Sequence, residues 1–372
     1  MRFLSVQIAI KFFFCLWLNC YEIFPDLGLA QAVAQELGVW AEGSIEISEL
    51  AEITYLDAED AGIEDLTGIG YLTNLEELNL GENQISNLAP GTFTDLTSLT
   101  SLILTNNQIS DLAPGTFAGL ESLMILSLWS NQISDLTTGA FAGLENLTNL
   151  YLDNNKIRDL ALDTFTNLTN LRTLSLSENQ IRDLASIANL TNLEGLSLWV
   201  NQISDLRPLE KLNLDWLDVA DQTIHLPATT IGATTTLYLY LPDGTEVALW
   251  STNGQLTFDN NQLTWQTPGY NSATWNNEMD GTVYFNETIY QTVAPARQIT
   301  ENHDQDQSLE IPESEADGNL PDKSPENPTS YPDEISEDEE IKEVPNNNED
   351  ELFLKEDELH LLPKNQQRVQ VE

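Results

Sequence analysis

Few residues in the sequence have the types and spacing that catalysis needs. The chain has three histidines, His225, His303 and His360, and none of them stands at a spacing typical of metal ligands. Its cysteines, Cys15 and Cys20, lie near the start, so the rest of the chain has no thiol. No nucleophile elbow or glycine-rich phosphate loop occurs either. We therefore expect no enzymatic activity, no metal site and no cofactor.

The composition limits the partners that the chain can have. Its 372 residues include 60 acidic and 14 basic ones, which gives a formal net charge of −46. Phosphate binding depends on clustered lysine and arginine, so this charge argues against nucleic acid as a partner. It is compatible with a basic partner, although it also serves simply to keep a surface protein soluble. With 41% apolar residues, the chain can form hydrophobic cores.

An asparagine recurs at a fixed spacing and marks an internal repeat. The interval is 24 residues, and 22 at the last step. The recurring residues are Asn83, Asn107, Asn131, Asn155, Asn179 and Asn201. Around each of them runs the pattern L-x-x-L-x-L-x-x-N-x-I-x-x-L. Degenerate copies at the two ends, with Ala61 and Gln222 in place of asparagine, bring the total to about eight.

The pattern predicts a stack of coils, each with one short strand. Apolar and polar residues alternate over 102–105, which indicates a strand with one buried face. A single coil cannot bury its own leucines, so coils must stack, and each buried leucine contributes about 1.5–3 kcal/mol. The asparagine amides can satisfy backbone groups that stacking removes from water, where an unsatisfied group costs about 1–3 kcal/mol. We therefore interpret the six asparagines as a structural ladder.

A phenylalanine recurs in four consecutive coils, again at intervals of 24 residues. These residues are Phe93, Phe117, Phe141 and Phe165. Their spacing predicts a stacked aromatic column in the core. The next coil is two residues shorter and has no phenylalanine at this position.

Residues between and just after the strand leucines face outward, and these positions vary from coil to coil. Large aromatic side chains on a rigid sheet are unusual unless they are covered in use, and tryptophan and tyrosine are enriched at binding hot spots. The candidate ligand-binding residues on this predicted concave surface are Ile103, Ile125, Trp129, Tyr151, Asp153, Trp199 and Trp216. Strand spacing places Trp129 and Trp199 roughly 15 Å apart, which suits a protein surface or a glycan. The alternative is that both tryptophans only pack along neighbouring leucines.

The pattern resembles the leucine-rich repeat, and its flanks resemble those of internalins and similar bacterial surface proteins. Upstream, IFPD opens a predicted helix and is followed by LTGIGYLTNLEELNL, as in the internalin cap and first repeat. Downstream, TFDNNQLTWQTPGY and DGTVYFNETIYQTV are similar to the small immunoglobulin-like sandwich of internalins. Internalin repeats are usually shorter and lack the phenylalanine column. The resemblance therefore implies the fold, but not the curvature or the partner.

The implied fold is an α/β solenoid with an N-terminal helical cap, followed by a small all-β immunoglobulin-like sandwich. The cap is expected over 21–52, the repeats over 53–224 and the sandwich over 225–296, with Trp265 and Tyr284 in the sandwich core. The apolar residues that recur at helical spacing in the cap are Leu27, Leu29, Val33 and Leu37.

The two ends of the chain have their own compositions. Residues 1–20 resemble a secretory signal, although Lys11 interrupts the apolar run. Residues 297–372 form an acidic segment that is expected to be disordered, because it cannot bury enough apolar surface to offset the entropy of ordering. Its last part contains LLPKNQQ, which matches a sortase signal only in its Leu-Pro step, so we expect no covalent anchoring.

These observations predict an extracellular adhesion protein that recognises a cell-surface protein, such as a host receptor, through the concave surface. The chain is expected to be a secreted or cell-surface monomer with no membrane span in its mature form. Two alternatives stay open. The concave aromatic residues could stack on the sugar rings of a glycan or the cell wall, or the solenoid could be a spacer that binds nothing.

Overall fold

The computed structural model describes residues 18–251, 255–279 and 283–295. The predicted acidic tail over 297–372 and residues 1–17 of the signal-like segment lie outside the described residues.

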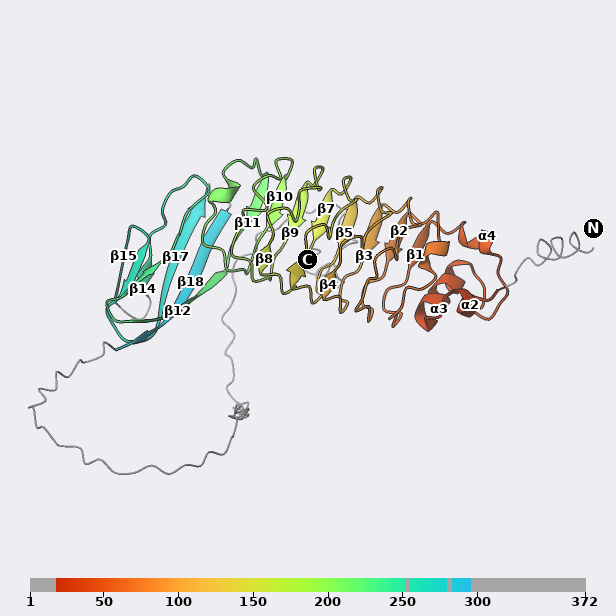
Figure 1. Ribbon diagram of the computed structural model, residues 1–372, viewed down its shortest axis with the longest axis horizontal. Helices are drawn as coiled ribbons and strands as arrows, with labels where there is room; N and C mark the ends of the chain where they lie inside the picture. Colours follow the sequence, from red (N-terminus) through yellow and green to blue (C-terminus); the bar gives the residue numbers. More distant parts are fainter. Residues whose placement is uncertain (1–17, 252–254, 280–282, 296–372) are drawn as a thin grey trace, which may run out of the picture. The chain divides into compact units, whose positions relative to one another are not determined.

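The repeats form a solenoid with one strand per coil, as predicted, and the strands join into an eight-stranded parallel sheet (Figure 1). The pairing has no register shift, so the central leucines of successive strands lie side by side, for example Leu78, Leu102 and Leu126. In sheet order the strands are β1 (Tyr55–Asp57), β2 (Glu77–Asn79), β3 (Ser101–Ile103), β5 (Ile125–Ser127), β7 (Asn149–Tyr151), β9 (Thr173–Ser175), β10 (Gly195–Ser197) and β11 (Trp216–Asp218).

Smaller elements complete the coils. A second parallel sheet contains β4 (Asp111–Leu112), β6 (Asp135–Leu136) and β8 (Asp159–Leu160). Two 3₁₀ helices also occur, η1 (Ile69–Tyr71) between β1 and β2 and η2 (Arg207–Leu209) between β10 and β11.

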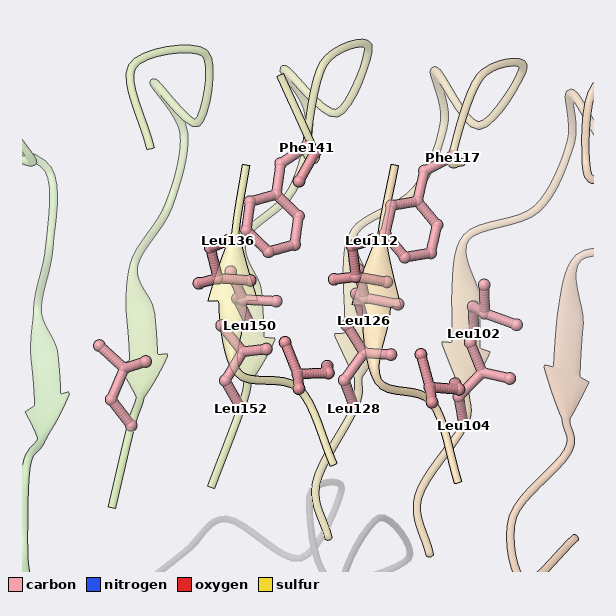
Figure 2. Packing of buried hydrophobic residues seen from close by; sticks show 14 of the residues in the cluster. Leu102, Leu104, Leu112, Phe117, Leu126, Leu128, Leu136, Phe141, Leu150 and Leu152 are labelled. Carbon is pink, nitrogen blue, oxygen red and sulfur yellow. The ribbon is translucent and has the colours of Figure 1, made fainter. Parts of the chain in front are cut away.

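The core of the solenoid is built from repeated leucine and phenylalanine layers. Leu102, Leu126 and Leu150 are fully buried, and Figure 2 shows them pointing into the coils beside their neighbours from adjacent strands. The four phenylalanines form the predicted column, with ring centroids 6.1–6.4 Å apart and nearly parallel planes. Each coil therefore buries its apolar surface against the next, which keeps the sheet rigid.

A helical segment precedes the first coil. It contains α2 (Cys20–Ile23), α3 (Leu27–Glu36) and α4 (Ile47–Leu50), and it begins before the predicted boundary, because Leu18 pairs with Ile45. Asp26 caps α3 through a hydrogen bond from Leu29 N, and its other oxygen accepts the backbone N–H groups of Glu64 and Asp65. This one carboxylate thus ties α3 to the first coils.

The predicted buried face of α3 needs one correction. Leu29 and Val33 are fully buried, as expected, whereas Leu27 is 58% exposed. Leu27 is the first residue of the helix, immediately after its capping residue Asp26. Gly28, by contrast, lies so close that a Cβ there would come within 2.2 Å of the Ala61 carbonyl oxygen.

The region after the repeats is all-β, with two small sheets. One sheet has the order β12 (Gln222–Thr230), β18 (Val283–Ala294), β17 (Gly269–Met279), β14 (Trp250–Ser251), and the other has β13 (Thr234–Thr236), β16 (Gln262–Trp265), β15 (Leu256–Asp259). Trp265 is fully buried and donates to Gln291 Oε1 at 2.8 Å, whereas the side chain of Tyr284 lies outside the described residues. The predicted boundary at 224 falls inside β12. An immunoglobulin-like topology for this region stays a prediction.

Candidate binding face

The outward-facing side of the eight-stranded sheet corresponds to the predicted concave surface. We call it the strand face. It consists of the first and third residues of each strand and of the two residues after the buried apolar residue that follows the strand, which is leucine in six of the eight coils. Because the strands pair in register, equivalent residues form columns across the coils. Ile103, Ser127 and Tyr151 are neighbours in one such column, and Gly195 and Trp216 in another.

Every coil leaves the strand face through a residue with left-handed backbone. Their φ angles lie between 50° and 56°. Asparagine and aspartate tolerate this conformation, whereas a β-branched residue is strained in it. Val200 is the β-branched member of the set. The left-handed residues are Asp60, Glu82, Asn106, Ser130, Asn154, Glu178, Val200 and Asp221.

The ladder asparagines lie directly behind this turn and hold neighbouring coils together. Asn131 accepts the N–H of Ile109 at 3.0 Å and donates to the carbonyls of Leu104 and Leu128 at 2.9 and 3.1 Å. The backbone groups involved are buried, so these bonds replace those that water would make. Asn107, Asn155, Asn179 and Asn201 make the same set of bonds with their own coils.

The two ends of the ladder differ from its middle. Asn83 accepts two N–H groups, from Ala61 at 3.1 Å and Ile63 at 2.9 Å. Gln222 continues the ladder in the last coil, since it accepts Ile203 N at 3.0 Å and donates to the Leu198 carbonyl at 2.8 Å. The sequence places Gln222 in register, but its longer side chain gave no reason to include it in the ladder.

A second ladder, which the sequence analysis missed, runs along the edge where the strands begin. Its asparagines donate to a backbone carbonyl of the preceding coil at 2.8 Å, as Asn146 does to Glu121. The other members are Asn74, Asn170 and Asn192. Asn146, Asn170 and Asn192 line a shallow groove of about 660 Å³ together with Met124 and Arg172. An Asn-Leu step precedes β2, β7, β9 and β10, and its recurrence was the signal that could have revealed this ladder.

The predicted binding residues lie in two groups on the strand face. The central group consists of Ile103, Ile125, Trp129, Tyr151 and Asp153, all partly exposed on the coils of β3, β5 and β7. The phenol oxygen of Tyr151 accepts a hydrogen bond from the side chain of Asn149 at 3.2 Å, which fixes its orientation. This group is largely apolar, because isoleucine and aromatic side chains stand in neighbouring columns.

Asp153 is the polar exception within the central group. Its carboxylate accepts hydrogen bonds from the Ser175 hydroxyl and from Ser177 N, the latter at 3.0 Å. Burial raises the pKa of Asp153, while these hydrogen bonds act in the opposite direction. The carboxylate is therefore engaged within the sheet, and it contributes to holding the coils as well as to the surface.

The second group lies on the last two coils and is built around two tryptophans. Trp199 and Trp216 are 37% and 38% exposed. Trp199 Nε1 donates to Asp221 at 3.0 Å. The Trp216 indole lies against the backbone of Gly195, where an added Cβ would come within 2.2 Å of the ring. A glycine inside a strand pattern signals this kind of close approach.

The strand face carries no basic residue. Acidic residues stand at both of its ends, among them Glu77 and Glu82 near the first coils and Asp218 and Asp221 near the last. Burial is the main cause that raises the pKa of Asp218, and the charge of Asp221 adds to it. Among the described residues, no group of three or more His, Cys, Asp or Glu side chains is placed to hold a metal ion. In the same part of the chain, no helix has the length and apolarity of a membrane span.

Comparisons with known proteins agree with the repeat architecture. The family model for the leucine-rich repeat matches residues 62–109, 97–157 and 145–203. An internalin (inlF) from Listeria monocytogenes is 34% identical, with a TM-score of 0.50, over 55% of this chain and 59% of that chain. Internalin C2 from the same species is 37% identical, with a TM-score of 0.48, over 56% and 87%. A secreted internalin-like protein from Listeria monocytogenes is 18% identical, with a TM-score of 0.51, over 75% and 99%, a likeness of fold alone. The chain thus spans about three fifths of the length of the first of these proteins.

Proposed function

Since the chain is a leucine-rich repeat protein similar to internalins, we propose that it binds a cell-surface protein through the strand face. Leucine-rich repeat proteins bind protein partners, and the likeness to internalins supports a role in protein interaction. The proposed site consists of Ile103, Ile125, Trp129, Tyr151, Asp153, Trp199 and Trp216. Binding, rather than catalysis, is the proposed activity.

The observation that carries the proposal is the row of large aromatic side chains held on a rigid sheet. Trp199 and Trp216 leave more than a third of their surface exposed, and Trp129 and Tyr151 of the central group are partly exposed. Aromatic residues held by packing lose little conformational entropy on binding, so they make strong anchors for a partner. The columns extend over several coils, which suits an extended protein surface better than a small molecule.

We also propose that the protein acts as a secreted or cell-surface monomer. The signal-like residues 1–20 support export, and one of the similar structures bears the name of a secreted internalin-like protein. The interaction needs no cofactor.

A glycan ligand is the second candidate. Tryptophan faces stack on sugar rings, and the side-chain amides of Asn106 and Asn154 stand at the edge of the same face, where they could bond to hydroxyl groups. The charge of the face distinguishes the two candidates only weakly, because neutral glycans are indifferent to it.

The test is capture of intact animal and bacterial cells by the full chain. It is compared with the triple variant Trp129→Ser, Tyr151→Ser and Trp199→Ser, and with the control Trp40→Ser and Trp250→Ser, which removes exposed tryptophans outside the strand face. We expect capture by the parent and the control, and none by a triple variant that keeps its thermal stability. Capture that survives protease treatment of the cells would favour the glycan. Equal capture by all three chains would mean that the binding site lies outside the strand face, as in the spacer alternative.

A further inference from the structure

The last two coils place two tryptophans on either side of a carboxylate. Trp216 begins β11, Asp218 ends it, and Trp199 follows β10 on the neighbouring coil. Asp218 is in register with Ser197, and Trp216 with Gly195. Because these partners on β10 are small, no bulky side chain of that strand stands over Asp218. The tryptophans thus form two walls, and the carboxylate lies on the floor between them.

Both walls are held in place by the fold. The close contact with Gly195 fixes the Trp216 indole, and the hydrogen bond to Asp221 fixes that of Trp199. Their exposed faces carry the negative electrostatic potential of the aromatic π-system. Immobile aromatic faces next to a carboxylate attract a cation both by the cation–π interaction and by charge.

No basic residue of the described ranges lies on the strand face. Within the described ranges, the two ion pairs are Arg172 with Glu194 and Arg207 with Asp205, and all four residues lie off the strand face. Burial raises the pKa of Asp218 and the charge of Asp221 adds to this, so a cation bound beside Asp218 would stabilise its ionised form. The carboxylates of the site are too few and too dispersed to be a metal site, since no three such ligands gather in this part of the chain.

We propose that the site formed by Trp199, Trp216 and Asp218 binds an arginine or lysine side chain of the protein partner. The inference rests on the proposed function and specifies the chemistry of the partner. The other end of the strand face is also acidic, with Asp57, Glu77 and their neighbours around Tyr55. The matching partner surface is therefore basic at its two ends and apolar where it meets the central group.

The test uses the full chain and a short fluorescein-labelled peptide of alternating arginine and serine. A second peptide has lysine, and a reference peptide has glutamine, in place of arginine. Binding is measured by fluorescence anisotropy for the parent chain and for Trp199→Ser and Trp216→Ser. Neither substitution changes the charge, so the attraction of the peptide to the many other acidic residues is the same for every chain. Trp40→Ser is the matched control, because Trp40 is 84% exposed and lies in the N-terminal helical region.

We expect each tryptophan substitution at the site to weaken binding of the arginine peptide by about two- to fivefold, the range of an exposed cation–π contact. Trp40→Ser should leave it unchanged. Asp218→Asn should weaken it as well, and by more than Asp243→Asn, which removes an equal charge from an exposed turn. Thermal unfolding of each variant shows whether it is folded.

The inference is overturned if the Trp199 and Trp216 variants bind the peptides like Trp40→Ser, or if the glutamine peptide binds as tightly as the arginine peptide. Its failure can be told apart from failure of the proposed function. If peptide binding is unaffected but the triple variant still loses cell capture, the strand face binds a partner that is not basic. If peptide binding depends on the tryptophans but cell capture does not, the cation-binding site is supported and the proposed function is refuted.

Discussion

Asn131 provides a direct test of the hydrogen-bond ladder. When its side chain is removed, some of its backbone partners keep another hydrogen bond and one does not. In Asn131→Ala, the carbonyls of Leu104 and Leu128 keep a second donor, from Asn107 at 3.2 Å and Asn155 at 3.0 Å. The buried N–H of Ile109 loses its acceptor. An orphaned buried donor costs about 1–3 kcal/mol, and the lost bonds to carbonyls that keep another donor add about 1 kcal/mol together. We therefore expect the free energy of unfolding to fall by about 2–4 kcal/mol.

The measurement is equilibrium unfolding in urea, followed by circular dichroism. Asn170→Ala is the matched control, because Asn170 also donates to a backbone carbonyl of the preceding coil, but at an exposed position. Its loss should cost less than about 1 kcal/mol, since water replaces the exposed bond. Equal and small changes for the two variants would refute the reasoning, because they would mean that the buried amide is replaceable by water or by local rearrangement.

Other predictions concern the strand face and the step between long and short coils. Gly195→Ala should displace the Trp216 indole, shift tryptophan emission to longer wavelength and weaken binding of the arginine peptide as Trp216→Ser does. Val200→Asn should stabilise the chain by about 0.5–1 kcal/mol in urea unfolding, because it relieves left-handed strain at a φ of 52°. Ser186→Ala should raise the melting temperature, since the buried Ser186 hydroxyl has no hydrogen-bond partner among the described residues. Burial raises the pKa of Asp153 in the folded state. The contribution of Asp153 to the free energy of unfolding is therefore fully present below its unfolded-state pKa and is lost as pH rises through its folded-state pKa. Asp153→Asn should therefore raise the melting temperature at neutral pH, by an amount that shrinks on acidification.

The repeat made much of the fold predictable. A period of 24 residues with leucine at fixed positions admits few structures other than a stack of coils, because no coil can bury its leucines alone. The same regularity predicted the phenylalanine column, since Phe117 and Phe141 can meet only if their coils are in register. The outward positions followed from the alternation of the strands.

What the sequence did not reveal depends on contacts between coils that differ from the consensus. From the sequence, Gly195 is only a residue that weakens a strand. The structure shows that the Trp216 ring packs against it. Gln222 departs from asparagine, yet its longer side chain makes the same bonds. Leu27 satisfies the helical spacing but is the first residue of the helix, and more than half of its surface is exposed. In each case the role of the residue depends on local geometry, and a periodic sequence pattern does not contain that information.

The central claim is that the strand face contacts a cell-surface protein. The most direct measurement places a photo-activated cross-linking residue at Ser101 or Thr173, both partly exposed on this face, and at Asn167 or Asn189, which are exposed outside it. After irradiation on intact cells, we expect Ser101 and Thr173 to give a cross-linked polypeptide that Asn167 and Asn189 do not give. Cross-links only from Asn167 and Asn189, or equally from all four positions, would contradict the account.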